Sequence, residues 1–141
     1  MQPALLDASI YVSALRSEAS AVALHRLIGG TVLWLSAVVL EELYAGAGER
    51  HRRVVEQWER DFGEAGRILV PNLSDWIRAG KVLRLLADKY DYEKIGRGRL
   101  TNDALIAVSA ARMGIRVITA NEKDFRRLAQ FHQFAWQLVT L

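Results

Sequence analysis

The sequence predicts a doubly wound α/β domain, in which a parallel sheet of four to five strands is flanked by helices. Short apolar runs alternate along the chain with longer segments of helical periodicity, which is the pattern of strands joined by helical crossovers. Strands covered on both faces read as continuous apolar runs, as these do. Residues 1–141 fit one domain with a single core, and no internal repeat, low-complexity segment or linker divides them.

The expected strands are short and rich in apolar or β-branched residues. The first ends at Asp7, the second is followed by Ser36, and Pro71 closes the third. The expected strands cover residues 3–6, 31–35, 67–70, 116–119 and 136–139. Because crossovers between parallel strands are right-handed, we expect one sheet with helices on both of its faces.

The expected helices begin at capping residues, and several end at glycines. Serines are placed to cap three of them: Ser9, Ser36 and Ser74. Thr101 or Asn102 is placed to cap the helix that starts at Asp103, after a polar loop over residues 91–99. The helices are expected to end near residues 15, 28, 45, 62, 90, 113 and 129. In the long helix that ends near residue 90, the spacing of apolar residues predicts that four of them face the core: Ile77, Val82, Leu85 and Leu86.

Composition limits the location and the chemistry. The absence of cysteine excludes disulfides and thiolate metal sites, and it is compatible with a cytoplasmic location. The longest uncharged run, residues 27–40, is too short to span a membrane, and no basic region precedes the first apolar stretch as in a secretion signal. We therefore expect no membrane association.

The net charge is +3, and the basic residues gather in three clusters, at residues 50–53, 94–99 and 123–127. Charge clusters on helices are most often solvated faces. They are also the footprint that a nucleic-acid phosphate backbone requires. Both interpretations remain open from the sequence.

Acidic residues follow the expected strands. Asp7 comes directly after the first strand, Asp124 follows the fourth, and Asp103 opens the helix before it. Glu41 and Glu42 lie on the helix after the second strand. Only one of the two can face inward, because neighbours on a helix are about 100° apart, and the apolar pattern around them favours Glu42. Ligand sites of doubly wound sheets lie beyond the carboxyl ends of the strands.

Each polar residue also has a purely structural interpretation. Asp7, Asp103 and Asp124 are placed to act as acids at helix starts, and Asn121 as a cap. Taken together, however, several carboxylates at one sheet edge repel one another unless a cation is present. An oxygen-rich site without cysteine, and without a histidine near it in sequence, suits Mg²⁺ or Mn²⁺. The chain has no glycine-rich phosphate loop, no GxSxG elbow and no cysteine nucleophile.

Four segments, in this order, resemble the PIN-domain nucleases, and within them the VapC-like toxins of toxin–antitoxin pairs. LLDASIYVSAL contains Asp7, SAVVLEELYAGA contains Glu42, LTNDALIAVSAARMG contains Asp103, and VITANEKDF contains Asn121 and Asp124. The resemblance covers essentially the whole chain. One departure is Ala8, where the family often has a hydroxyl residue, although Ser9 keeps the next polar position.

The resemblance implies metal-dependent hydrolysis of RNA phosphodiester bonds. Asp7 and Asp103 are expected to be direct ligands of Mg²⁺ or Mn²⁺, Glu42 a ligand or the residue that positions water, and Asp124 a ligand through water. Two further polar residues are expected to support ligands or phosphate: Ser9 and Asn121. Two arginines before Asp103 are expected to grip flanking phosphates: Arg97 and Arg99.

The resemblance also implies two protein partners: a small antitoxin that obstructs the site, and a second copy of the chain in a homodimer. Trp58, Trp76 and Trp136 are candidates for apolar contact, although tryptophan is more often buried. Two alternatives remain. One is a PIN-domain nuclease of RNA maturation or decay that is not a toxin. The other is a non-catalytic RNA-binding or protein-binding module.

Overall fold

The computed structural model describes residues 2–91 and 97–140, and the side chains of residues 97–99 lie outside that description. In the described chain, one five-stranded sheet has the order β3-β2-β1-β4-β5, and every pairing in it is parallel. The strands are β1 (Ala4–Leu6), β2 (Leu33–Ser36), β3 (Ile68–Leu69), β4 (Arg116–Thr119) and β5 (Trp136–Leu138). This confirms the doubly wound sheet that the sequence predicts, with five strands.

The strand order reverses at β1. From β1 the chain adds β2 and then β3 on one side, and later returns to add β4 and β5 on the other. β1 and β4 are neighbours in register, with Leu6 opposite Ile118. Their carboxyl ends therefore meet where the sheet changes direction, which is where ligand sites of such sheets occur.

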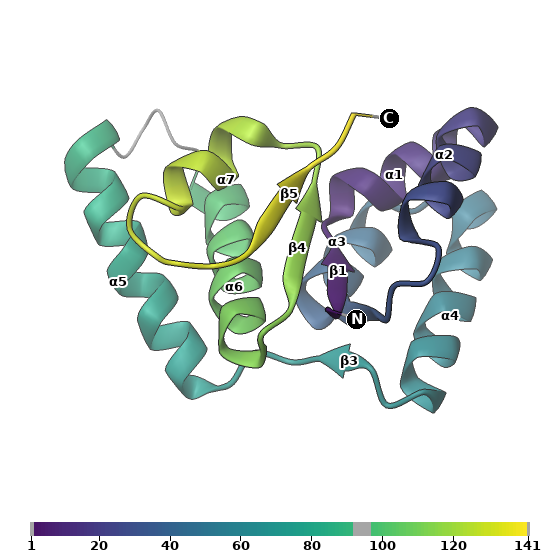
Figure 1. Ribbon diagram of the computed structural model, residues 1–141, viewed down its shortest axis with the longest axis horizontal. Helices are drawn as coiled ribbons and strands as arrows, with labels where there is room; N and C mark the ends of the chain where they lie inside the picture. The colour runs from purple at the N-terminus through teal and green to yellow at the C-terminus, as the bar shows by residue number, and fades with distance from the viewer. Residues whose placement is uncertain (1, 92–96, 141) are drawn as a thin grey trace.

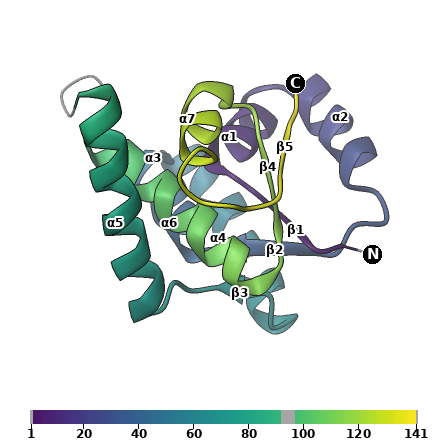
Figure 2. The same cartoon turned by 60° about the vertical axis from the view of Figure 1, so that its left-hand side comes forward.

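Helices cover the sheet on both sides. The helices are α1 (Ala8–Arg16), α2 (Glu18–Ile28), α3 (Ala37–Gly46), α4 (Glu49–Glu64), α5 (Leu73–Tyr90), α6 (Arg97–Met113) and α7 (Glu122–Leu128). Figure 1 shows α5 and α6 on one side of the strands, and α1, α2 and α4 on the other. Figure 2 also labels β2, which lies beside α4 with β3 below it in that view. No helix in the described ranges is both long and apolar enough to cross a membrane.

The core lies between the sheet and the helices. Its largest contribution from one helix is α6, in which every residue from Leu100 to Ala110 is buried except Thr101 and Asn102. The first strand is fully buried as well, as expected for a central parallel strand. α6 packs against α5 and β4, and its buried side chains from Leu100 onward lie in the core.

Two helix starts differ from the prediction. α6 begins at Arg97 and not at Asp103, so Thr101 and Asn102 lie within the helix and do not cap it. α1 begins at Ala8, so Ser9 is inside the helix, and Asp7 occupies the capping position. Ser36, in contrast, caps α3 as predicted, because its Oγ accepts a hydrogen bond of 3.2 Å from the backbone N–H of Val38.

The inward face of α5 also differs. Val82 and Leu86 are buried as predicted, but Ile77 and Leu85 are 52% and 42% exposed. The helix is capped by Asn72, not Ser74, in a capping box with Asp75. Asp75 is itself buried and forms an ion pair with Arg112 of α6, with an N–O distance of 2.9 Å. The buried stripe therefore begins at Asp75 and continues at positions three or four residues apart, which turns Ile77 and Leu85 outward.

Candidate functional site

Asp7 lies at the carboxyl end of β1 and at the start of α1. Its backbone has the extended conformation of a capping residue, but its side chain makes no capping hydrogen bond. The carboxylate instead accepts two hydroxyl donors, Ser9 Oγ on Oδ1 and Thr119 Oγ1 on Oδ2, each at 2.6 Å. Asp7 is therefore more than a helix-start residue, because its two carboxylate oxygens are held in place by two side-chain hydroxyls.

Burial makes the ionised form of Asp7 costly. The residue is 4% exposed, and burial raises the pKa of its carboxyl above the ordinary value of 3.8. Hydrogen bonds from Ser9 and Thr119 act in the opposite direction and lower this pKa. A buried carboxylate of this kind is stabilised in its charged form by a nearby cation.

A chain of hydrogen bonds leads from Asp7 to Asp124. Thr119 Oγ1 accepts the backbone N–H of Asn121 at 2.9 Å. The amide Nδ2 of Asn121 donates to Asp124 Oδ2 at 3.0 Å, while its Oδ1 accepts the backbone N–H of Asp124 at 3.4 Å. Asn121 is therefore the cap of α7, and the same side chain orients Asp124. The end of β4 thus places Asp124 within a network that starts at Asp7.

Glu42 and Asp103 come from two helices that pack together, α3 and α6, and α3 also packs against α1. Asp103 is 7% exposed. Glu42 is half-buried while Glu41 is exposed, as the helix geometry predicts. One carboxylate oxygen of each acid, Glu42 Oε1 and Asp103 Oδ2, is buried from solvent. Asp103 is in the second turn of α6, so the interpretation as a first-turn acid fails.

Asp7, Ser9, Asn121 and Asp124 are thus joined by hydrogen bonds that run through Thr119, and Glu42 and Asp103 are supplied by α3 and α6. No three acidic or histidine side chains in the described ranges are arranged to hold one metal ion as they stand. The donors themselves fit Mg²⁺ or Mn²⁺: they are carboxylate oxygens, and those of Asp7 and Asp103 are withdrawn from water. A metal ion would offset the burial of these charges. The side chains of Arg97 and Arg99 lie outside the described residues.

Thr119 is a site residue that sequence reasoning missed. It is fully buried and contacts both Asp7 and Asn121. The segment VITANEKDF includes it, but as the last residue of a strand it reads as a β-branched strand former. The signal that could have identified it is the pairing of β1 with β4, which places the two strand ends side by side.

Comparisons with solved structures show the same fold. A chain of the DNA-bound VapBC complex from Salmonella typhimurium is 22% identical with a TM-score of 0.72, and the match covers 97% of this chain and 98% of that chain. VapBC2 from Rickettsia felis, bound to a promoter DNA fragment, gives 22% identity, a TM-score of 0.67 and coverage of 99% and 100%. VapBC-1 from nontypeable Haemophilus influenzae gives 25% identity and a TM-score of 0.63, and the match covers 97% of this chain and 98% of that chain.

A comparison with curated protein sequences gives no match. The family model of the PIN domain, in contrast, matches residues 4–130, which include all four acids and the hydroxyls that hold Asp7. The members of this family are nucleases. The chain belongs to the PIN domain family.

Proposed function

We propose that the chain is a ribonuclease that hydrolyses RNA phosphodiester bonds with the help of Mg²⁺ or Mn²⁺, and that it is the toxin of a toxin–antitoxin pair. The observation that carries the proposal is the carboxylate of Asp7, buried at the carboxyl end of β1 and held by hydrogen bonds from Ser9 and Thr119. A buried, oriented carboxylate at this edge of a parallel sheet is suited to binding a cation that in turn binds phosphate.

The acids have distinct roles in this proposal. Asp7 and Asp103 are direct ligands, because both are almost fully buried and supply hard oxygen donors. Glu42, which is half-buried, is a ligand or orients the attacking water. Asp124, held by Asn121, completes the site through water. The bound divalent cation supplies an activated water and offsets the negative charge that develops on the phosphate.

The remaining polar residues orient these acids or contact the substrate. Ser9 and Thr119 fix both oxygens of Asp7, and so orient the carboxylate toward a cation in the proposed site. Arg97 and Arg99 remain predicted contacts of the flanking phosphates. Without these and other basic groups, the acids would repel the RNA backbone.

The direct test is an RNA cleavage assay with protein free of contaminating nuclease. We expect cleavage that requires Mg²⁺ or Mn²⁺, that EDTA abolishes, and that is lost in Asp7→Asn and Asp103→Asn. Glu42→Gln should also lose activity, while Glu41→Gln is the matched control, because Glu41 is adjacent in sequence but exposed. Full cleavage by Asp7→Asn would refute the site. A protein that binds no Mn²⁺ would favour the non-catalytic binding module.

The matched structures are VapBC complexes, which supports a small antitoxin protein as the partner and a toxin role for this chain. Induced expression should then arrest growth, and Asp103→Asn should not. Co-expression of a short neighbouring reading frame should restore growth. If expression has no effect on growth while the purified protein still cleaves RNA, the chain is a maturation or decay nuclease. An RNA substrate implies that the protein acts in the cytoplasm.

A homodimer is the second proposed assembly. Four apolar residues at the end of β3 and the start of α5 are strongly exposed: Val70 (62%), Leu73 (75%), Trp76 (56%) and Ile77 (52%). We call them the Trp76 surface. Exposed apolar clusters of this kind mark protein contacts. Trp58 and Trp136, in contrast, are partly buried and pack against the core, so Trp76 is the tryptophan that supports an interface.

A further inference from the structure

The start of α4 carries arginines whose role is not explained by the four acids of the proposed site, which we call the acid cluster: Asp7, Glu42, Asp103 and Asp124. We propose that Arg16, Arg50, Arg52 and Arg53, which we call the arginine track, bind the phosphates of the RNA strand where it leaves the acid cluster. The proposal rests on the proposed function, because it assigns a binding surface to that RNA. It selects, from the three basic clusters of the sequence, the one at residues 50–53.

A cavity of about 320 Å³ places one of these acids, Glu42, in the same wall as one arginine of the track, Arg16. Glu42 lies in its wall, and so do Arg16 from the end of α1 and His51 from the first turn of α4. The cavity therefore lies where α1, α3 and α4 meet. A phosphate next to the one bound at Glu42 would enter a space whose far side is basic.

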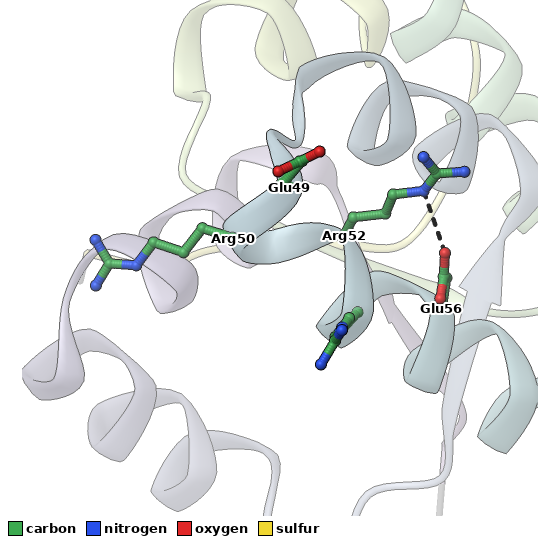
Figure 3. A pocket seen from close by; sticks show the side chains of 5 residues that line it. Glu49, Arg50, Arg52 and Glu56 are labelled. Carbon is green, nitrogen blue, oxygen red and sulfur yellow. Dashed lines mark hydrogen bonds and ion pairs between the residues drawn. The ribbon is translucent and has the colours of Figure 1, made fainter.

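A second hollow, of about 670 Å³, continues along α4. It is lined by Glu49, Arg50, Arg52, Arg53 and Glu56. Figure 3 shows Arg50 and Arg52 extending in opposite directions from the start of the helix. His51 lines the first cavity, and its neighbours Arg50 and Arg52 line the second, so both hollows border the first turn of α4. In the proposal, the RNA strand passes from Glu42 over this turn.

Three arginines of the track are available for phosphate. Arg52 forms an ion pair with Glu56, with an N–O distance of 3.2 Å. Arg16, Arg50 and Arg53 form no ion pair with any residue in the described part of the chain, and all three are exposed. Guanidinium groups bind phosphate oxygens through paired donors, which suits them to this role. Basic groups outnumber Glu49 and Glu56 along the track.

The backbone at the start of α4 also favours the binding of a phosphate. Gly48 is the capping residue of α4 and has no side chain to cap it, so the positive end of the helix dipole lies at the same surface. A Cβ at Gly46 or Gly48 would meet no other atom within 4 Å, which shows that the bend between α3 and α4 is open. An extended polyanion can therefore pass close to the helix start.

The test is the salt dependence of RNA binding. The probe is a fluorescently labelled uridine oligonucleotide, and its anisotropy is measured in the Asp7→Asn background so that no cleavage occurs. Each phosphate contact to single-stranded nucleic acid contributes about 0.7 to the slope of log K against log salt. Arg50→Gln/Arg53→Gln should therefore reduce the magnitude of the slope by about 1.4. In the active protein the same pair should raise KM and leave kcat unchanged.

The matched control is Lys81→Gln/Arg84→Gln, which removes the same charge from exposed positions on α5. Figure 1 shows α5 and α4 on opposite sides of the molecule. The control should keep the parent slope. Equal reductions of the salt slope in both double variants would mean that RNA is attracted by the overall charge of the protein, and would overturn the track. An unchanged salt slope in Arg50→Gln/Arg53→Gln would also overturn the track. This holds even if that variant no longer binds the antitoxin, because the arginines would then serve the antitoxin and not RNA.

Failure of the track and failure of the proposed function give different results. If the active protein cleaves RNA in a metal-dependent manner and the α4 pair binds RNA as its parent does, the track is wrong and the ribonuclease assignment stands. If the active protein neither cleaves nor binds RNA, both are wrong.

Discussion

Thr119 donates a hydrogen bond of 2.6 Å to Asp7, although the two residues are 112 positions apart in the sequence. The sheet explains the contact, because Leu6 of β1 pairs with Ile118 of β4, and this register places the next residues, Asp7 and Thr119, side by side. Thr119 Oγ1 also accepts the backbone N–H of Asn121. One buried hydroxyl thus joins the acid after β1 to the segment that carries Asp124.

Thr119→Val removes this hydroxyl and keeps the branched shape. The carboxylate of Asp7 then loses one of its two side-chain donors, and the N–H of Asn121 loses its acceptor. We expect Mn²⁺ affinity and RNA cleavage each to fall by about 10–100-fold, the usual effect of removing a residue that orients a metal ligand. Calorimetric titration with Mn²⁺ measures the first effect. Thr119→Ser is the control, and equal affinity in the two variants would refute the role of the hydroxyl.

Asp7→Asn should make the metal-free protein more stable. The buried carboxylate is costly when ionised, and the amide carries no charge. One of the two hydroxyls, Ser9 or Thr119, can rotate to accept from the new NH₂ group while the other still donates to the amide oxygen, so both contacts can be kept. In EDTA at pH 7 we expect a higher Tm than for the natural sequence. Mn²⁺ should then raise the Tm of the natural sequence and leave that of Asp7→Asn unchanged, because a ligand stabilises only the state that binds it.

The stability gain of Asp7→Asn should depend on pH. The folded state raises the pKa of Asp7, so between 3.8 and the raised value the folded protein binds more protons than the unfolded chain. Stability contributed by this group therefore falls as pH rises through that window. The Tm difference between variant and natural sequence, measured in EDTA, should shrink as pH is lowered from 7 toward 4. A difference that grows at low pH would show that burial of the charge is not its cause.

The fold was predictable because its signals are local. Each strand is a short apolar run, and each loop carries recognisable turn or capping residues, so the parallel sheet follows from their alternation. The start of α6 was not predictable in this way, because Gly98 and the charged residues around it favour a loop in isolation. The helix nevertheless begins at Arg97, and its continuation is among the most buried segments of the chain. Packing of α6 in the core outweighs the weak local preference.

The placement of the candidate site residues was predictable where strand ends determine it. Asp7 and Asn121 follow β1 and β4, and the choice of Glu42 over Glu41 follows from helix geometry alone. Thr119 was not predictable from its own sequence context, since its role comes from the register of two strands far apart in the chain. The relative placement of Glu42 and Asp103 depends on how α3 and α6 pack, which no sequence pattern specifies.

The ion pair between Asp75 and Arg112 should be important for stability. Asp75 is 2% exposed and Arg112 Nε lies 3.0 Å from both of its oxygens. Arg112→Met leaves a buried carboxylate without its charged partner, which typically costs about 3–5 kcal/mol. Urea unfolding should show this loss. Adding Asp75→Asn removes the stranded charge and keeps a capping acceptor for Asn72, so the double variant should recover part of the stability. No recovery would mean that Arg112 acts through packing.

The Trp76 surface should mediate self-association. Trp76 is the largest side chain of this surface and is 56% exposed. Tryptophans that become buried in an interface often contribute most of its binding energy. Trp76→Ser should weaken a dimer by about 2 kcal/mol or more, which is about thirtyfold in Kd. Light scattering after size-exclusion chromatography, over a range of protein concentrations, measures the change.

Leu85→Ser is the matched control for Trp76→Ser. Leu85 is also an exposed apolar residue of α5, with 42% exposure, but it lies more than two turns further along the helix, outside the Trp76 surface. The control variant should keep the dimer of the natural sequence. If both variants remain dimeric, the interface lies elsewhere on the molecule. If the natural sequence is already monomeric at high concentration, the exposure of Trp76 requires another partner, and the proposed homodimer is wrong.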